Sequence, residues 1–193
     1  MTLSSQDALQ DPPPPTDVYT SLSVPSSASR FTRYAWFVLG YLGLVILWGA
    51  WVRISGSGAG CGAHWPTCNG VVVPLNPTLE TLIEYTHRLT SGLSLPLVFV
   101  LVGWSFRRFP AGSGVRGASL GALFFLLTEA ALGAGLVKFE LVAGDTSVAR
   151  AVTASFHLVN TFALSAFSAL VAWWSNPEHT GASFHPRLKN KGS

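Results

Sequence analysis

Two histidines in apolar stretches of the chain are the residues best suited to do chemistry. His87 lies in LIEYTHRLTSG and His157 lies in ASFHLVNTF. Holding an imidazole among apolar side chains costs free energy unless the ring binds a partner. One interpretation is that the two rings bind a shared ligand. The other is that each ring hydrogen-bonds to a neighbouring helix, and for His157 taken alone the two interpretations have equal weight.

Two acidic residues accompany the histidines. Glu84 precedes His87 by three residues and Arg88 by four, so these three side chains share one face of a helix. Such a group is typical of a functional site inside a membrane protein, while the same residues would also suit the interface at a helix end. Glu129, in LTEAALGAGLV, lies near the middle of another apolar stretch. It could relay protons, or it could hydrogen-bond to Asn160 or to a serine.

The chain has two cysteines, Cys61 and Cys68, seven residues apart in a glycine-rich segment. A loop of this size can close a disulfide ring, which would be either a structural staple or a redox-active pair. A third alternative is metal binding together with His64, although two cysteines and one histidine make an incomplete zinc set. The spacing leaves these three alternatives open.

The composition indicates that membrane-spanning helices position these residues. Of the 193 residues, 49% are hydrophobic and 11% are charged, whereas a soluble domain carries roughly 25% charged residues. Crossing a hydrocarbon core of ~30 Å takes ~20 apolar residues in a helix. Four stretches are long enough, at about 34–54, 81–105, 117–139 and 149–174. We therefore predict an all-α membrane protein built as a four-helix transmembrane bundle.

The basic residues predict the topology, because Lys and Arg are enriched in cytoplasmic segments. Most of them fall on one side of the predicted bundle: Arg30, Arg33, Arg107, Arg108, Arg116, Arg187, Lys189 and Lys191. We therefore expect a multi-pass protein of the cell membrane with both termini cytoplasmic and with the 55–80 and 140–148 loops extracytoplasmic. The basic residues neither cluster nor alternate with exposed aromatics, which argues against nucleic-acid binding.

The ends of the chain differ in composition from its middle. Residues 1–30 are rich in Pro and Ser and have no apolar period, so we expect a disordered tail there. Residues 31–175 would form the four-helix domain. Residues 176–193 are polar and would form a cytoplasmic tail.

The second and fourth predicted helices run in the same direction, so the depths of their histidines can be compared. His87 lies about six residues after the start of its stretch and His157 about eight after the start of its own. At 1.5 Å per residue both rings lie roughly 10 Å below the outer surface. Bundle cores commonly hold metals and cofactors, and two facing imidazoles can bind the iron of a heme from both sides.

The loop after the first helix combines several motifs with the helix that follows it. The run GAWVRISGSGAGCGAHWPTCNGVVVP contains Gly56-Ser57-Gly58 and a Cys-x6-Cys loop with Trp65-Pro66, and LIEYTHRLTSG contains a Glu-x-x-His. This combination resembles the heme A synthase family, also called the cytochrome oxidase assembly family. The resemblance covers about residues 36–174.

The resemblance implies a reaction and a heme site. Members of that family oxidise the C8 methyl group of heme O to the formyl group of heme A for terminal oxidases, and they hold heme between two histidines in four-helix bundles. By carry-over, His87 and His157 would be the axial ligands of the iron, and the heme would be heme b, heme O or both. Glu84 would be the carboxylate near the reacting heme edge, assisting proton transfer or stabilising a cationic intermediate.

The same resemblance implies roles for the loop and for three arginines. Cys61 and Cys68 would form a disulfide in the outer loop. Arg53, Arg88 or Arg150 would pair with the heme propionates, and the resemblance does not choose among them.

This chain departs from the family pattern in its number of helices. A usual member has eight helices in two similar halves, each with its own histidine pair, and this chain resembles the N-terminal half. One half does not by itself supply both a substrate heme and a cofactor heme. We therefore expect, in the lipid membrane, a homo-oligomer or a partner subunit, with heme O synthase as a candidate.

Two other functions compete with the enzyme. One is a non-catalytic bis-histidine heme protein that transfers electrons or delivers heme during oxidase assembly. The other is an interaction protein without heme, in which His87 and His157 would be packing residues.

Overall fold

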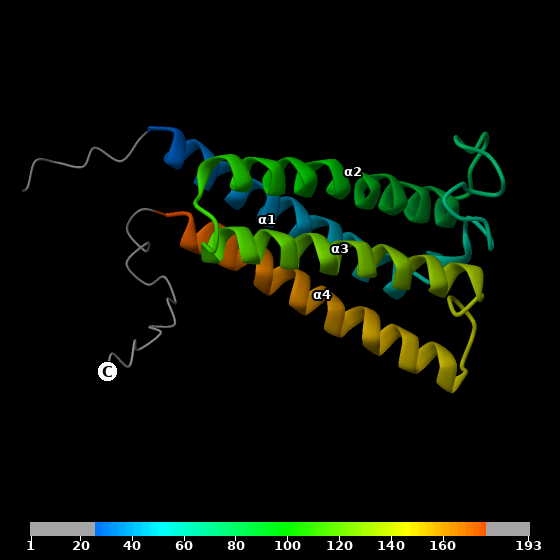
Figure 1. The fold of residues 1–193 in the computed structure, drawn as a ribbon. Helices are drawn as coiled ribbons and strands as arrows, with labels where there is room; N and C mark the ends of the chain where they lie inside the picture. The colour runs from blue at the N-terminus through cyan, green and yellow to red at the C-terminus, as the bar shows by residue number, and fades with distance from the viewer. Residues whose placement is uncertain (1–25, 177–193) are drawn as a thin grey trace, which may run out of the picture.

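Four long helices make up most of residues 26–176, the part of the chain that the computed structural model describes (Figure 1). They are α1 (Ser26–Ile54), α2 (Leu79–Arg108), α3 (Gly114–Lys138) and α4 (Val148–Trp174), and a short 3-10 helix, η1 (Ser57–Ala59), follows α1. Each of the four is long and apolar enough to cross a membrane. The predicted all-α four-helix membrane fold is therefore confirmed over these residues.

Three of these helices have a polar N-cap residue that lies slightly before the predicted apolar stretch. The side chains of Thr78, Ser113 and Ser147 each accept a hydrogen bond from a backbone N–H of the first turn, which has no partner within the helix. Helix α1 begins at Ser26, inside the segment that we assigned to the N-terminal tail. The other residues of the two expected tails, 1–25 and 177–193, lie outside the described part of the chain.

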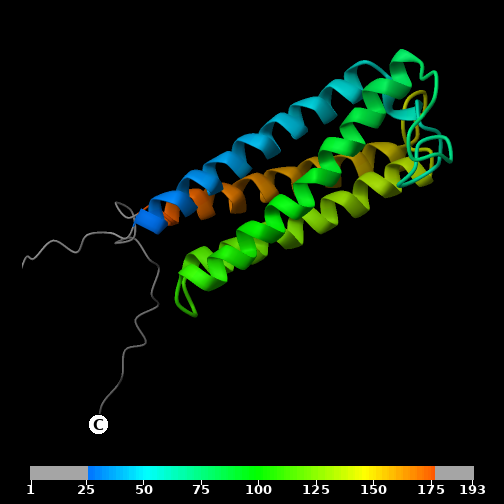
Figure 2. The same ribbon diagram turned by 90° about the horizontal axis from the view of Figure 1, so that it is seen from above.

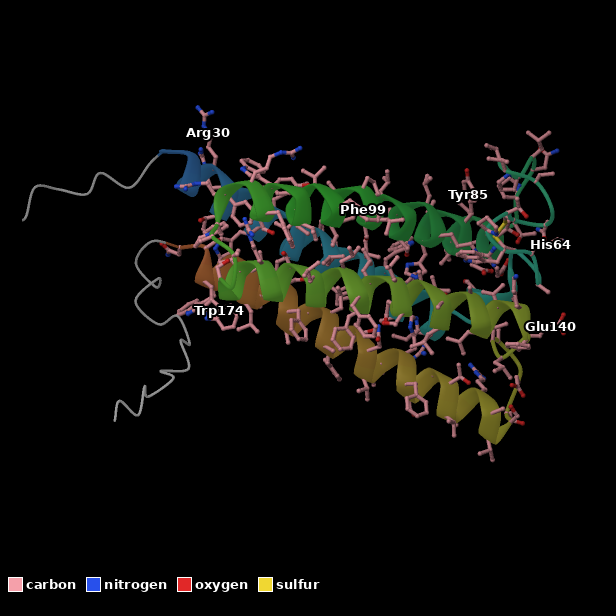
Figure 3. All side chains as sticks on the ribbon, in the orientation of Figure 1. Arg30, His64, Tyr85, Phe99, Glu140 and Trp174 are labelled. Carbon is pink, nitrogen blue, oxygen red and sulfur yellow. A yellow bond between two sulfur atoms is a disulfide. The ribbon has the colours of Figure 1, made fainter. Side chains whose placement is uncertain are left out.

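The helices pack in chain order around the bundle. Both α1 and α3 pack mainly against α2 and α4, so α2 and α4 lie on one diagonal. The loops that follow α1 and α3 lie at one end of the bundle, which we call the loop end (Figures 1 and 2). Arg30 and Trp174 mark the opposite end (Figure 3). Toward the loop end α4 diverges from α2 (Figure 1).

The apolar core lies in the half of the bundle away from the loop end. Its buried side chains come from all four helices: Phe31, Ala35, Val38, Leu42, Val98, Leu101, Val115, Ala118, Ala122, Leu126, Leu164, Val171 and Ala172. Helices α3 and α4 approach closely there, since a Cβ on Gly121 would lie 2.3 Å from the ring of Phe167. This packing fixes the helices against one another and leaves the other half for polar residues.

Candidate functional site

One level in the loop half of the bundle has no buried residue on any of the four helices. The stretches are 43–51 in α1, 85–93 in α2, 127–135 in α3 and 148–159 in α4. Protein interiors are normally packed as densely as organic crystals. The side chains at this level are therefore less completely buried than those of a packed interior, and we call it the histidine level because both histidines lie in it.

The two histidines reach the histidine level from opposite corners of the bundle. His87 lies eight residues after Leu79, where α2 begins, and His157 lies nine residues after Val148, where α4 begins. These positions are about 12 and 14 Å along the helix axes. The rings therefore lie at similar depths on the α2–α4 diagonal.

A glycine of α1 makes room for the ring of His87. A Cβ on Gly49 would lie 2.8 Å from Cε1 and 3.1 Å from Nε2 of His87, closer than side chains normally approach. The Nδ1 atom of His87 is buried and has no hydrogen-bond partner among the described residues. Because an unpaired buried nitrogen is costly, the ring has an unused capacity to bind.

The ring of His157 rests against a glycine and a carboxylate of α3. A Cβ on Gly133 would lie 3.9 Å from Nε2 of His157, so no side chain crowds that nitrogen from this helix. The Nδ1 atom lies 3.1 Å from Oε1 of Glu129. The angle at Nδ1 is not that of a hydrogen bond, and this nitrogen has no other partner in the described chain.

Polar side chains of α4 hold Glu129. Its Oε2 accepts a hydrogen bond from Nδ2 of Asn160 at 2.6 Å, and its Oε1 accepts one from the hydroxyl of Thr161 at 2.5 Å. The hydroxyl of Thr128 donates in turn to Oδ1 of Asn160 at 2.7 Å. The hydrogen bond to Asn160 confirms one of the roles expected for Glu129. These bonds offset the cost of a carboxyl group in a spanning helix.

Glu84 and Arg88 form a buried ion pair that anchors the loop after α1. Nε and Nη2 of Arg88 donate to Oε1 of Glu84 at 3.0 and 2.5 Å. Oε2 of Glu84 accepts from the backbone N–H of Cys61 at 2.8 Å. Arg88 also donates to the carbonyl oxygens of His64 and Thr67, at 2.5 and 2.7 Å. Both carboxylate oxygens therefore have partners in the protein, which a buried charge requires.

Cys61 and Cys68 form the disulfide that the resemblance implied. The bonded sulfurs offer no thiolate to a metal, and the described residues contain no group of three or more side chains that could hold one. The metal-binding alternative is therefore not supported, whereas a staple and a redox-active pair both fit. The loop is also tied to the first turn of α2, since the hydroxyl of Thr81 donates to the carbonyl oxygen of Gly60 at 2.7 Å.

The three arginines expected at the propionates differ in their partners. Arg88 is engaged in the ion pair above. Arg53 lies exposed at the end of α1 and donates to the carbonyl oxygen of Ala154 on α4 at 3.4 Å. Arg150, one turn before Ala154, donates to the carbonyl oxygen of Asp145. Neither Arg53 nor Arg150 forms a salt bridge within residues 30–176, so both guanidinium groups can receive an anion.

The loop between α3 and α4 prepares the start of α4. The carboxylate of Asp145 accepts hydrogen bonds from the hydroxyl and the backbone N–H of Ser147, at 2.8 and 2.9 Å. These bonds lower the pKa of Asp145 below its ordinary value. The resulting anion near the N-terminus of α4 is favoured by the helix dipole.

The donor set at the histidine level fits a heme. Two imidazoles reach it from opposite corners of the bundle and would hold an iron between them, and Nε2 of His157 is not crowded by α3. A glycine beside each ring leaves space where a larger residue would put a side chain. Arg53 and Arg150 lie toward the rim of the same level and suit anionic propionates.

Sequence reasoning missed the glycines Gly49 and Gly133 and the pairing of Glu129 with His157. Which residues of neighbouring helices meet depends on how each helix is rotated about its axis, and apolar stretches do not fix that rotation. One indication was available, because Glu129 and Gly133 are four residues apart and therefore share a face of α3.

Residues 32–192 match the family described as Cytochrome oxidase assembly protein. The chain belongs to this family. A heme A synthase from Alkalihalophilus pseudofirmus is 36% identical over 141 residues, which are 72% of this chain and 45% of that protein. A heme A synthase from Halalkalibacterium halodurans is 42% identical over 96 residues, 50% of this chain and 32% of that protein.

A protein from Thermus thermophilus named Protoheme IX farnesyltransferase is 55% identical over 149 residues, which are 77% of this chain and 24% of that protein. The chain thus spans less than half the length of each of these relatives. No solved structure matches it. The family and the four spanning helices support a multi-pass membrane protein and a role in heme A biosynthesis or oxidase assembly, and the family implies a heme-related cofactor.

Proposed function

We propose that this chain is a compact heme A synthase-type oxidoreductase, which oxidises the C8 methyl group of heme O to the formyl group of heme A for terminal oxidase assembly. The observation that carries the proposal is the pair His87 and His157, which reach one level without buried residues from opposite corners of the bundle. Heme bound there would supply a redox-active iron. The protein supplies position, charge and exclusion of water.

Individual residues have distinct tasks in this proposal. Nitrogens of His87 and His157 hold the iron. Arg53 and Arg150 bind propionates and so fix which edge of the porphyrin turns inward. Glu84 lies three residues before His87 on the same helix face, so its carboxylate is the acid group nearest to that ligand in sequence. We assign it to the reacting edge, where it would assist proton transfer or stabilise positive charge.

The setting of the reaction follows from topology and relatives. We propose that the 55–80 loop lies on the extracytoplasmic side of the cell membrane, where a disulfide such as Cys61–Cys68 persists. One relative is named a protoheme IX farnesyltransferase, which favours an enzyme of that kind as the source of heme O and as a partner. The proposed reaction uses a substrate heme and a cofactor heme, whereas the histidine level offers one pair of ligands, so we propose that a second copy of the chain or a partner subunit supplies the second heme.

Extraction of heme from the purified protein tests this function. The protein is expressed in membranes with and without a heme O source, and the extracted heme is identified by chromatography. Heme O together with heme A supports the synthase. In that case Glu84→Ala should retain heme and lose conversion, and full conversion by this variant would overturn the role of Glu84.

A non-catalytic bis-histidine heme protein is the second candidate, and one observation favours it. Both oxygens of Glu84 are engaged by Arg88 and by the backbone of Cys61, which suits an anchor better than a group that exchanges protons. This candidate predicts stable heme b under both expression conditions and no formyl product. A protein purified with ample heme but without a Soret band would exclude both candidates.

A further inference from the structure

Glu129 is a carboxyl group in the middle of a spanning helix, and the proposed function does not use it. We infer that it is the positioning residue of His157: its carboxylate accepts a hydrogen bond from Nδ1–H of His157, directs Nε2 of the same ring to the iron, and favours ferric over ferrous heme. This inference rests on the proposed heme site, and its test separates the two.

The geometry of α3 places an acceptor at one ring nitrogen and open space near the other. Oε1 of Glu129 lies 3.1 Å from Nδ1 of His157, and one turn later Gly133 leaves Nε2 uncrowded. Because Nδ1 has no other partner among the described residues, Glu129 is the group that can set the tautomer. With its hydrogen on Nδ1, the ring has a donor for the carboxylate and leaves Nε2 as the nitrogen that can bind a metal.

The position of the carboxylate is itself fixed. Thr161 and Asn160 each donate to one of its oxygens, at 2.5 and 2.6 Å, and both residues are buried. Glu129 therefore has little freedom to turn away from His157. Groups that orient a ligating histidine are typically held in this way by further hydrogen bonds.

A purely structural role does not account for the carboxylate. Helices α3 and α4 are already joined at this point without it, since Nδ2 of Asn160 donates to the carbonyl oxygen of Phe125 at 2.8 Å and Thr128 donates to Oδ1 of Asn160 at 2.7 Å. A buried acid is costly in a spanning helix, so a link between the two helices does not by itself explain why an acid lies here. In contrast to a structural link, a negative charge next to an axial ligand would stabilise the ferric state of the heme iron.

The two ligands are then unequal. His87 has no hydrogen-bond partner at Nδ1 within the described residues, and its neighbour on α1 is a glycine. His157 has a carboxylate that raises the basicity of its ring. The stronger donor on one side makes α4 the helix that holds the iron most firmly and lowers the reduction potential of the heme.

The test compares three variants of the full-length heme-loaded protein in detergent. Glu129→Gln keeps the size of the side chain but removes its charge and replaces one acceptor oxygen by an amide N–H₂. Ser155→Ala on α4 is the control, because the exposed hydroxyl of Ser155 donates to the carbonyl oxygen of Ala151 in its own helix. Glu129→Asp keeps the charge but draws it back by one methylene. The readouts are the midpoint potential of the heme and the g values of the low-spin ferric EPR signal.

We expect Glu129→Gln to shift the ferric-to-ferrous ratio at a fixed solution potential about tenfold toward ferrous heme, which is ~59 mV for one electron, and to change the g values. Glu129→Asp should give a smaller shift of the same sign, and Ser155→Ala none. An unchanged potential in Glu129→Gln with the low-spin signal intact would overturn the inference. If Glu129→Gln does not fold, Glu129→Asp decides by the same criterion. Failure of the heme site itself is visible earlier, as absence of bis-histidine heme in the unaltered protein.

Discussion

Around the two histidines, the residues with the strongest influence are those that leave space or accept hydrogen bonds. Gly49 and Gly133 contribute no side chain beside the rings, and Glu129 contributes an acceptor at 3.1 Å. A ligand residue acts only when its ring can reach the iron in the correct rotamer. The neighbours therefore decide whether His87 and His157 work as ligands.

Replacing Gly49 should displace His87. In Gly49→Ala the new methyl group would lie 2.8 Å from Cε1 of His87, and overpacking of this kind costs about 1–3 kcal/mol. We expect heme retention to weaken about tenfold or more, since ~1.4 kcal/mol is a factor of ten. The measurement is the heme-to-protein ratio after purification and after competition with apomyoglobin.

Gly40→Ala on the same helix is the control for Gly49→Ala. A Cβ there meets nothing within 4 Å, so this change should leave heme content unaltered and stabilise the helix by up to ~1 kcal/mol. Equal heme content in the two variants would show that the close approach of Gly49 to His87 is unimportant.

Removing the carboxylate of Glu84 should destabilise the loop after α1, in addition to any effect on the proposed reaction. Glu84→Ala leaves Arg88 partly buried without its ion-pair partner and leaves the N–H of Cys61 without its acceptor. Breaking a buried pair in this way costs about 3–5 kcal/mol. We expect a lower unfolding midpoint in detergent and faster reduction of the Cys61–Cys68 disulfide by dithiothreitol.

Glu80→Gln separates this anchoring from a general effect of charge. Glu80 is exposed in the first turn of α2, so solvent and salt screen its charge, and we expect its loss to leave the loop and the disulfide unaffected. Disulfide reduction at the same rate in Glu84→Ala and in the unaltered protein would contradict the anchoring role.

At the scale of helices, the start of α4 is the least supported segment among the described elements. None of residues 148–159 is buried, whereas Asn160, Thr161, Leu164, Ser168, Val171 and Ala172 are. Few buried contacts mean a low free energy of local opening. The hydrogen bonds at Asp145 and Ser147 hold the first turn, and a ligand on His157 would hold the third.

Hydrogen exchange of α4 should therefore depend on heme. Without heme we expect backbone amides of 148–159 to exchange faster than those of 160–172, and with heme bound we expect protection of 148–159 to rise while 160–172 changes little. Mass spectrometry of peptides from protein in nanodiscs measures both segments in one sample. Equal protection of 148–159 with and without heme would mean that the bound ligand does not rest on α4.

The helices could be predicted from sequence because length and apolar composition determine what can span a bilayer. The ends of the helices were harder to predict, because hydropathy does not detect a polar last turn. Helix α2, for example, continues through Arg107 and Arg108. The caps Thr78 and Ser147 would have improved two of the boundaries. The depth of each histidine followed from its position in a span, whereas the neighbours Gly49 and Glu129 depend on helix rotation, which no apolar stretch encodes.

At the scale of the whole molecule, the bundle divides into two halves with different tasks. The half away from the loop end contains the apolar core and determines how the helices sit. The loop half contains the histidines, the ion pair Glu84–Arg88 and the disulfide. This division allows one half to remain packed while the other binds and releases a large ligand. The proposed function also requires that the loop half face the extracytoplasmic side of the membrane.

That side can be determined with one cysteine at each end of the bundle. Thr146 lies exposed in the α3–α4 loop and Ala111 lies exposed in the α2–α3 turn, and the native cysteines are both in the disulfide. Basic residues flank Ala111, namely Arg107, Arg108 and Arg116, so the positive-inside rule predicts that this turn lies in the cytoplasm. In intact cells or spheroplasts, a membrane-impermeant maleimide should label Thr146→Cys. It should label Ala111→Cys only after the membrane is permeabilised. The reverse pattern would put the disulfide loop in the reducing cytosol and the heme ligands near the cytoplasmic face, which would contradict both the predicted topology and an extracytoplasmic site of oxidation.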